Sequence, residues 1–280
     1  METWIPKIIP ETHRVQFSGL SKCPDEIRFC VNQPVTVRYG QQEQSLWPAT
    51  DSHQIGKIFQ AACRQSVYAH AGTIRQGYLL LEGGHRMGIC GSGVCQDRGL
   101  QTLIHPSSLV IRCAKAHLGC AEHAAQRCCR STLILGPPGS GKTTLLRDFI
   151  RVLSDDKKQR VGVADERGEI SAMVEGIPQM KIGARTDVLV NVPKVDAVMM
   201  LLRTMNPQWI AMDEITAPKD LDALRHASYC GIRLVATAHG EDEEDLRKRP
   251  LYKDMMEMEI FSHLVILGQD RSYTIKEVSV

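Results

Sequence analysis

The sequence predicts an α/β fold in which a mostly parallel sheet, covered by helices on both faces, follows a smaller α+β domain. Residues 131–280 alternate short apolar runs with stretches of helical periodicity, which is the pattern of a parallel sheet. A glycine-rich turn at residues 136–141 separates the first of these strands from the first helix. Residues 1–115 instead show period-two alternation and hairpin signals, typical of antiparallel strands.

The elements of the second half follow from its apolar runs. The predicted strands are 131–135, 160–164, 209–212, 234–237, 263–267 and 273–278. The predicted helices are 142–153, 195–205 and 218–230, the last of which stops at Gly231, a residue suited to the position after a helix. These elements define an expected domain over residues 131–280.

The first half contains fewer and shorter elements. Strands are expected at 26–29, 35–38 and 109–111, and a helix at 52–64 that Asp51 caps. Runs at 78–81 and 86–90 flank Gly83 and Gly84 and predict a hairpin. We expect a docking or assembly domain over residues 1–115 and an alanine-rich connecting helix over 116–130.

Composition excludes several classes of protein. The 280 residues are 43% hydrophobic and 24% charged, which is not the composition of a disordered or fibrous chain. The net charge of +2 gives no reason to expect nucleic acid as a partner. No apolar run reaches the roughly 18 residues that a membrane span needs, and the first residues do not resemble a secretory signal. We therefore expect a cytoplasmic protein.

The strongest functional signal is the phosphate-binding loop, which fits G-x-x-x-x-G-K-[ST] between a strand and a helix. Backbone N–H groups of such a loop surround a polyphosphate, and the helix N-terminus favours its charge. Lys142 is expected on the β- and γ-phosphates, and the Thr143 hydroxyl on Mg²⁺. The expected nucleotide contacts are Gly136, Pro137, Pro138, Gly139, Ser140, Gly141, Lys142, Thr143 and Thr144.

A second signal places two carboxylates at the end of the strand 209–212. Ligands of open α/β sheets lie at the carboxyl ends of the strands, where Asp213 and Glu214 follow. We expect Asp213 to hold Mg²⁺ and Glu214 to act as the general base that polarises the attacking water, a role worth roughly 10²–10⁴-fold in rate.

Other candidates also lie at strand ends. The segment 236–240 carries His239 where a γ-phosphate would be sensed, and Asp165 and Glu166 follow the second strand near the nucleotide. Arg185 and Arg203 are candidates for an arginine that stabilises charge on the γ-phosphate. Surface ion pairs are an equally good explanation for these two arginines.

The motifs carry a family resemblance. In order, GPPGSGKTT, DERGEI, GARTDVL, LLRTMNPQWIAMDEI and ATAHG resemble the P-loop, RecA-like ATPases of bacterial secretion and pilus systems. With TIRQGY and GGHR upstream, the chain more closely resembles the stage III AA sporulation family of that group. The resemblance covers most of the chain.

The resemblance implies a hexameric ATPase that uses ATP and Mg²⁺. It further implies a position on the cytoplasmic face of a sporulation membrane complex, with that complex's subunits as partners, on the mother-cell side. Lys142, Thr143, Asp213 and Glu214 fit the family's Walker elements. The chain departs from many secretion ATPases in having Asp213 where they have glycine, and it lacks the four-cysteine zinc module of some of them.

One cluster invites a metal-binding interpretation, namely His117, Cys120, His123, Cys128 and Cys129. Its spacing does not match the paired C-x₂-C arrangement of a structural zinc site, so no zinc is expected. Three other functions stay open besides ATP hydrolysis: a small-molecule kinase, a nucleotide-binding switch or assembly scaffold with little hydrolysis, and a nucleic-acid translocase. The kinase lacks a lid-like insertion, and the translocase lacks a basic stripe.

Overall fold

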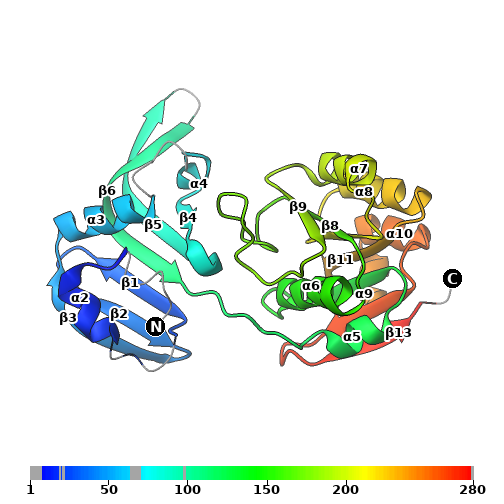
Figure 1. Cartoon of the computed structure of the whole chain (residues 1–280), viewed down its shortest axis with the longest axis horizontal. Helices are drawn as coiled ribbons and strands as arrows, with labels where there is room; N and C mark the ends of the chain where they lie inside the picture. Colours follow the sequence, from blue (N-terminus) through cyan, green and yellow to red (C-terminus); the bar gives the residue numbers. More distant parts are fainter. Residues whose placement is uncertain (1–7, 19, 21–22, 64–70, 97–98, 279–280) are drawn as a thin grey trace. The chain divides into compact units, whose positions relative to one another are not determined.

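The computed structural model describes residues 8–18, 20, 23–63, 71–96 and 99–278. The chain divides into two compact units, Met1–Lys115 and Ala116–Val280 (Figure 1). Among the described residues, no helix combines the length and the apolar character that crossing a membrane requires.

The first unit is built on a six-stranded antiparallel sheet of order β3-β2-β1-β6-β5-β4. Its strands are β1 (Glu26–Cys30), β2 (Gln33–Tyr39), β3 (Gln42–Thr50), β4 (Tyr78–Leu80), β5 (Arg86–Gln96) and β6 (Gly99–Arg112). Its helices are α2 (Glu11–Ser18), α3 (Ser52–Ala62) and α4 (Ala71–Arg75), and the short 3₁₀ turn η2 is Glu82–Gly84. Buried Ile27, Phe29, Val35 and Val37 alternate with more exposed residues, as period-two patterning predicts.

Most predicted elements of this unit are confirmed, with differences at their ends. Asp51 caps α3 through a capping box, whereas Arg64 lies outside the described residues. The hairpin forms between β4 and β5 through η2. The prediction of a three-residue strand at 109–111 was wrong in extent, because β6 pairs with β5 far beyond the apolar run. Its polar residues there are held by ladder hydrogen bonds that side-chain patterning does not report.

The second unit contains a seven-stranded sheet of order β13-β12-β7-β11-β10-β8-β9. Its strands are β7 (Thr132–Gly136), β8 (Val161–Asp165), β9 (Thr186–Val190), β10 (Trp209–Met212), β11 (Arg233–His239), β12 (His263–Leu267) and β13 (Tyr273–Glu277). All neighbouring strands are parallel except β12 and β13. The predicted α/β fold with a mostly parallel sheet is confirmed.

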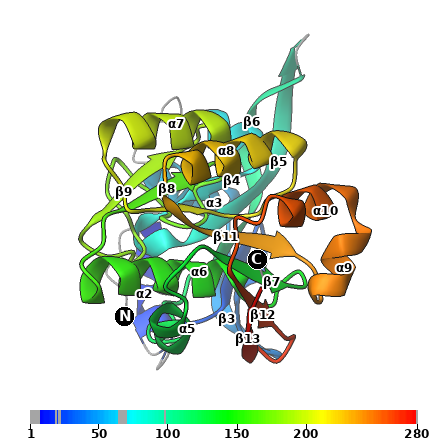
Figure 2. The same cartoon turned by 90° about the vertical axis from the view of Figure 1, so that its right-hand side faces the viewer.

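Helices cover both faces of this sheet. The helices are α5 (Glu122–Arg127), α6 (Lys142–Arg151), α7 (Lys194–Thr204), α8 (Pro218–Tyr229), α9 (Glu243–Lys248) and α10 (Pro250–Glu257). In Figure 2, α7 and α8 lie on one side of the sheet and α5 and α6 on the other. Strands β7, β8 and β10 are buried along their whole length, because both of their faces are covered.

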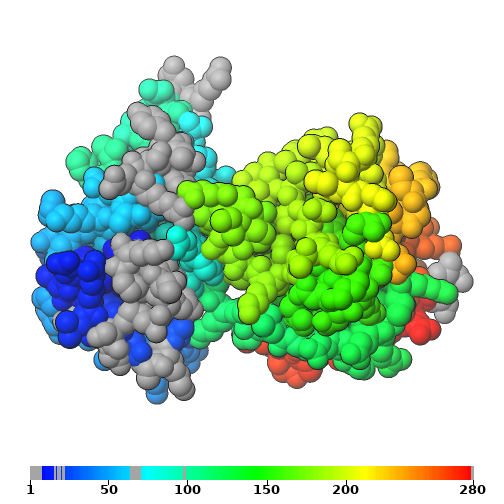
Figure 3. All heavy atoms as spheres, viewed as in Figure 1, coloured from blue at the N-terminus to red at the C-terminus, as the bar shows by residue number. Residues whose placement is uncertain are grey.

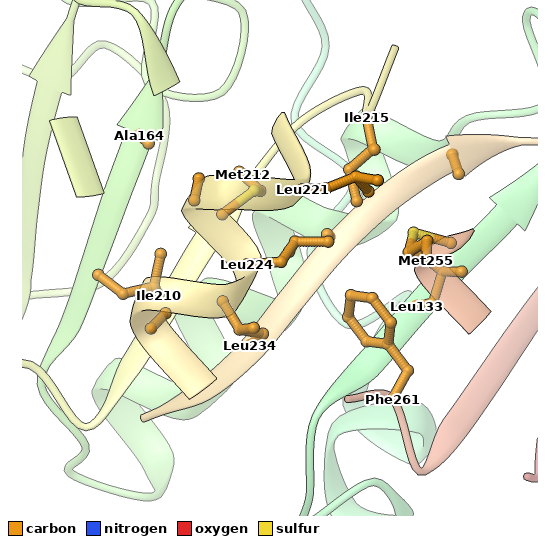
Figure 4. Close-up of a cluster of buried hydrophobic side chains, with 14 of the residues drawn as sticks. Leu133, Ala164, Ile210, Met212, Ile215, Leu221, Leu224, Leu234, Met255 and Phe261 are labelled. Atoms are coloured by element: carbon orange, nitrogen blue, oxygen red, sulfur yellow. The ribbon is translucent and has the colours of Figure 1, made fainter. Parts of the chain in front are cut away.

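The core between the sheet and α8 is made of aliphatic side chains. Figure 4 shows Leu221 and Leu224 of α8 beside Ile210, Met212 and Leu234 of the sheet. All five are no more than 5% exposed. This packing fixes the level at which β10 ends, and therefore where the residues after it emerge.

The predicted connecting helix over 116–130 was wrong in length. Only Glu122–Arg127 is helical. Gly119 has a φ of 86°, which ends any helix before it, and the Ala121 amide donates to Asp148 of α6 instead of to a helical carbonyl (2.8 Å). The helix predicted over 142–153 is α6, and after Arg151 it continues as a π-helical turn over Val152–Asp156.

Candidate functional site

Strand register brings the candidate segments to one edge of the sheet. Met212 of β10 lies opposite Ala236 of β11, and His239 of β11 lies opposite Gly136 of β7. The residues that follow Met212 therefore meet the end of β11 and the phosphate loop. This is the carboxyl edge at which open α/β sheets bind their ligands.

The phosphate loop has no room for side chains at its first glycine. A Cβ on Gly136 would lie 2.5 Å from Ser140 Oγ and 3.1 Å from Leu267 Cβ. Gly139 and Gly141 have φ values of 76° and 100°, which disfavour any other residue. Within the described part of the chain, the buried Ser140 hydroxyl has no hydrogen-bond partner. The loop therefore presents an unpaired polar group beside the N-terminus of α6, where a phosphate oxygen could accept a hydrogen bond from it.

Lys142 occupies the first turn of α6 with its side chain largely buried. Its Nζ donates to Pro137 O (3.0 Å) and lies 3.1 Å from His239 Nδ1. Burial lowers the pKa of Lys142, and the charges of Glu214 and Asp213 partly offset this. The ammonium group is thus held at the mouth of the loop, where the predicted phosphate contact would form.

Asp213 joins three segments through its carboxylate. Its Oδ2 accepts from the Thr143 hydroxyl (2.8 Å), and its Oδ1 accepts from the Thr237 hydroxyl and from the Glu214 amide (3.0 Å). Oxygen donors of this kind are what Mg²⁺ prefers. Together with the unpaired Ser140 hydroxyl nearby, the Thr143 and Asp213 oxygens fit the predicted Mg²⁺–nucleotide site.

Glu214 is held from several sides. Its backbone has a φ of 43°, its amide also donates to Thr237 Oγ1 (2.8 Å), and its carbonyl accepts from Lys194 Nζ (2.9 Å). Its carboxylate contacts His239 Nε2 (2.9 Å) and Arg167 Nη1 (2.5 Å). Burial of this carboxylate works to raise its pKa, but the hydrogen bond from His239 and the charge of Arg167 outweigh burial, so the pKa is lowered.

His239 bridges the two charged groups. If Lys142 donates to Nδ1, then Nε2 carries the proton and donates to Glu214, which is the pattern of a neutral imidazole. The ring thereby links the phosphate loop to the candidate base, at the end of the strand where we expected a residue that senses the γ-phosphate.

Asp165 is the buried last residue of β8. It is 2% exposed, and its carboxylate accepts from the Ile170 amide (3.1 Å), the Ser171 amide (2.9 Å) and the Ser171 hydroxyl (2.7 Å). It therefore builds the turn after β8. Glu166 instead faces Lys194 (3.2 Å).

A small cavity lies between this turn and the end of β10. It measures about 10 Å³, room for about one water molecule. Its lining is almost entirely charged: Asp165, Glu166, Arg167, Glu169, Lys194, Asp213 and Glu214.

A larger cavity of about 260 Å³ opens on the other side of the phosphate loop. Its lining residues are His117, Cys120, Gly139, Ser140, Gly141, Thr144, Leu145, Leu267, Arg271 and Tyr273. It adjoins the start of α6 but contains neither Asp213 nor Glu214. A polyphosphate lying along the loop would have its terminal phosphate near those carboxylates, so this cavity is where a nucleoside would fit.

Arg185 and Arg203 lie away from these groups within one chain. Arg185 immediately precedes β9, and its carbonyl accepts from the amide of Val161, the first residue of β8 (3.0 Å). Arg203 lies in the last turn of α7, a helix whose first residue is Lys194. Both arginines thus lie toward the amino-terminal edge of the sheet, opposite the phosphate loop.

The histidines and cysteines of residues 117–129 lie in different environments. His117 and Cys120 line the larger cavity, His123 stacks on Tyr273 (6.3 Å between ring centroids), and Cys128 is buried whereas Cys129 is exposed. Burial raises the pKa of both the Cys120 and the Cys128 thiol to about 11. Protonated thiols are poor metal ligands.

Several site residues were missed by sequence reasoning. Arg167 and Lys194 carry ordinary surface residue types, and their partners are distant along the chain. Arg167 is adjacent to the Asp165–Glu166 pair, which was the one available signal. The phosphate-loop part of the larger cavity was predicted, but its combination with residues 117–120 and 267–273 was not, because these three segments share no sequence pattern.

The chain is similar to proteins of sporulation. A family model described as sporulation stage III, protein AA, matches residues 4–277. The Stage III sporulation protein AA of Bacillus subtilis (strain 168) is 35% identical over 283 residues, covering 95% of this chain and 90% of that protein. The chain belongs to the sporulation stage III protein AA family.

Solved structures share the fold. The pilus retraction motor PilT, solved with bound ADP, aligns with a TM-score of 0.65 at 14% identity. The alignment covers 97% of this chain and 84% of the PilT chain. The ATPase DotB of Legionella pneumophila has a TM-score of 0.55 at 14% identity, with coverages of 90% and 75%. The fold expected from the resemblance to secretion and pilus ATPases is confirmed.

We predict that Thr237→Val destabilises the protein by about 1–3 kcal/mol, because the fully buried hydroxyl pairs with both Asp213 and the Glu214 amide. Thr237→Ser should retain most of the stability. Urea unfolding of the ligand-free protein measures both, with Thr274→Val on the exposed side of β13 as the control. Equal stability of Thr237→Val and wild type would contradict the bridging role.

Proposed function

We propose that this protein is a Mg²⁺-dependent ATPase of the secretion-ATPase type. The observation that carries the proposal is the hydrogen-bonded set formed by Lys142, His239, Glu214 and Asp213 at the end of the phosphate loop. A phosphate-binding cation, a carboxylate base and an oxygen-rich metal site lie within one connected group. This combination suits transfer of the γ-phosphoryl group to water.

The chain's own residues divide the work. Lys142 binds the β- and γ-phosphates, and Thr143 and Asp213 hold Mg²⁺, which when bound would neutralise phosphate charge. Glu214 orients a water molecule and accepts its proton. The water oxygen bonds to the γ-phosphorus, the bond from that phosphorus to the bridging oxygen breaks, and ADP and phosphate leave. His239 keeps the Glu214 carboxylate in line with Lys142.

We place the nucleoside of ATP in the cavity of about 260 Å³. Aromatic and aliphatic groups, Tyr273 and Leu267, offer a surface for a base, while His117 and Arg271 supply polar edges. Thr144 connects this cavity to the phosphate loop. The mostly apolar character with a few polar groups is typical of ligand sites.

The biological role in the proposal follows from family membership. The family is named for stage III of sporulation, and the fold is shared with the pilus motor PilT and the ATPase DotB. We propose a hexameric ring that acts from the cytoplasm of the mother cell on the membrane complex between mother cell and forespore.

Lys142→Ala should abolish nucleotide binding or nearly so, because its ammonium group is the cation at the mouth of the loop. Glu214→Gln should instead bind ATP normally and lose roughly 10²–10⁴-fold in turnover, because an amide cannot accept the proton. Fluorescent-nucleotide titration and phosphate release measure the two effects. The assay contains no phosphoryl acceptor other than water, so phosphate release also distinguishes an ATPase from a kinase.

Two results would contradict these assignments. Wild-type ATP affinity in Lys142→Ala would remove the lysine from the phosphate site. Unchanged hydrolysis by Glu214→Gln would require another base, with Glu166 the next candidate. If the wild-type protein binds ATP but does not hydrolyse it, the protein is better explained as a nucleotide-binding switch.

ADP should slow the alkylation of Cys120 by iodoacetamide at pH 8, because the thiol lines the proposed nucleoside cavity. The exposed Cys230 should react at the same rate with and without ADP. Mass spectrometry of the labelled peptides measures both rates. Equal rates at Cys120 with saturating ADP would place the nucleoside elsewhere.

The arginines at the opposite edge of the sheet predict a shared active site. We expect Arg185→Ala or Arg203→Ala to bind ATP but lose turnover, since an arginine supplied by a neighbour is worth roughly 10³–10⁵ in rate. A mixture of that variant with Lys142→Ala should recover activity that neither has alone. Specific activity that stays constant down to a demonstrated monomer, with an inactive mixture, would show that one chain completes the site.

A further inference from the structure

The turn after β8 is constructed to hold its exposed residues in place. Asp165 closes it through three hydrogen bonds, and the Gly168 amide donates to Asp165 O (3.1 Å). Gly168 has a φ of 67°, which gives the turn its sharp reversal. The backbone of Arg167 lies inside this closed turn.

The same turn is anchored to the helix of the phosphate loop. Arg147 of α6 donates to Ile170 O and Glu169 O, both at 2.9 Å. Figure 3 shows the adjoining segments, α6 in green and the yellow-green region after residue 165, on one face of the second unit. Movement of the turn relative to Lys142 and Thr143 is therefore restricted.

From this anchored turn, Arg167 reaches the second oxygen of the Glu214 carboxylate. Its Nη1 lies 2.5 Å from Glu214 Oε2, while His239 Nε2 lies 2.9 Å from Oε1. With one donor on each oxygen, the plane of the carboxylate is determined. The cavity of about one water molecule is bordered by both Arg167 and Glu214.

Exposure alone would make this ion pair weak. The side chains of Arg167 and Glu214 are 59% and 25% exposed, and exposed pairs contribute about 0–1 kcal/mol, partly because two flexible side chains must be ordered. Here the backbone on each side is already fixed, by Asp165 and Arg147 for the turn and by Lys194 and Thr237 for Glu214. Only the two side chains remain to be ordered, so the pair can orient Glu214 even where it adds little stability.

We propose that Arg167 is a positioning residue that orients the Glu214 carboxylate toward the attacking water. The inference rests on the proposed ATPase function. Arg167 acts through Glu214 and does not contact the nucleotide. The segment DERGE therefore contributes to turnover through its arginine, while Asp165 builds the turn that presents it.

Arg167→Ala should lower kcat by roughly 10- to 100-fold, a share of the roughly 10²–10⁴-fold that a general base contributes, and should leave KM for ATP within about 2-fold. Arg167→Lys should restore part of the loss, because a lysine keeps the charge but not the planar guanidinium. Arg247→Ala is the matched control. Arg247 is 55% exposed and pairs with Glu243 at 2.8 Å within α9, outside the hydrogen-bonded set around Glu214. Thermal unfolding should be alike for the two alanine variants.

A double variant tests whether Arg167 acts by positioning Glu214 or by contacting phosphate directly. In Glu214→Gln, adding Arg167→Ala should leave ATP affinity within about 2-fold, because the guanidinium acts only on residue 214. A loss of affinity in this background would overturn the proposal in favour of a phosphate contact. An unchanged or faster kcat for Arg167→Ala alone would also overturn it. Wild-type protein without turnover would remove the ATPase function and this inference together, whereas wild-type turnover unaffected by Arg167→Ala would remove the inference alone.

Discussion

The candidate site depends on the Asp213 carboxylate more than on any other group. Its two oxygens connect the helix after β7, the end of β11 and the backbone after β10 through Thr143, Thr237 and Glu214. Such convergence is possible only because β11 lies between β7 and β10 and all three are parallel. A shift of one residue in either register would turn these side chains to opposite faces of the sheet. The buried packing of α8 on β10 and β11 is therefore a requirement of the site as well as of stability.

Charge balance explains why so many ionised groups share a half-buried space. Arg167 pairs with Glu214 and Lys194 with Glu166 at contact distances, and buried Asp220 adds a further carboxylate beside Lys194. The charges of Glu214 and Asp213 act on Lys142 through space. Each cation thus has an acidic neighbour that offsets its desolvation. Adding a polyphosphate makes the space strongly negative. A divalent cation on the Thr143 and Asp213 oxygens would restore the balance, which supports the proposal that Mg²⁺ and nucleotide bind together.

Much of the site could be predicted because parallel strands deliver their following residues to one edge. The sequence predicted Lys142 and Thr143 from the phosphate-loop motif, and Asp213, Glu214 and His239 from their places after apolar runs. The structure brings these five together. Hydrogen bonds between residues that are distant in the sequence could not be predicted, because they leave no repeating pattern along the chain. The buried turn made by Asp165 resembles an exposed acidic segment in sequence. Residues 118–121 form a turn, after which the Ala121 amide donates to Asp148 of α6. Alanine content predicted a helix there because it reports local preference and not this tertiary bond.

The two donors on the Glu214 carboxylate also bear on its proposed role as the base. They lower its pKa and so weaken it as a proton acceptor. In phosphoryl transfer, however, the bond to the attacking oxygen is little formed in the transition state, so the water becomes acidic only late. A strong base would then gain little, whereas holding the water in line with the breaking bond removes orientational freedom at the barrier. A carboxylate held by His239 on one oxygen and by Arg167 on the other therefore suits the proposed role of orienting the water better than the role of a strong base.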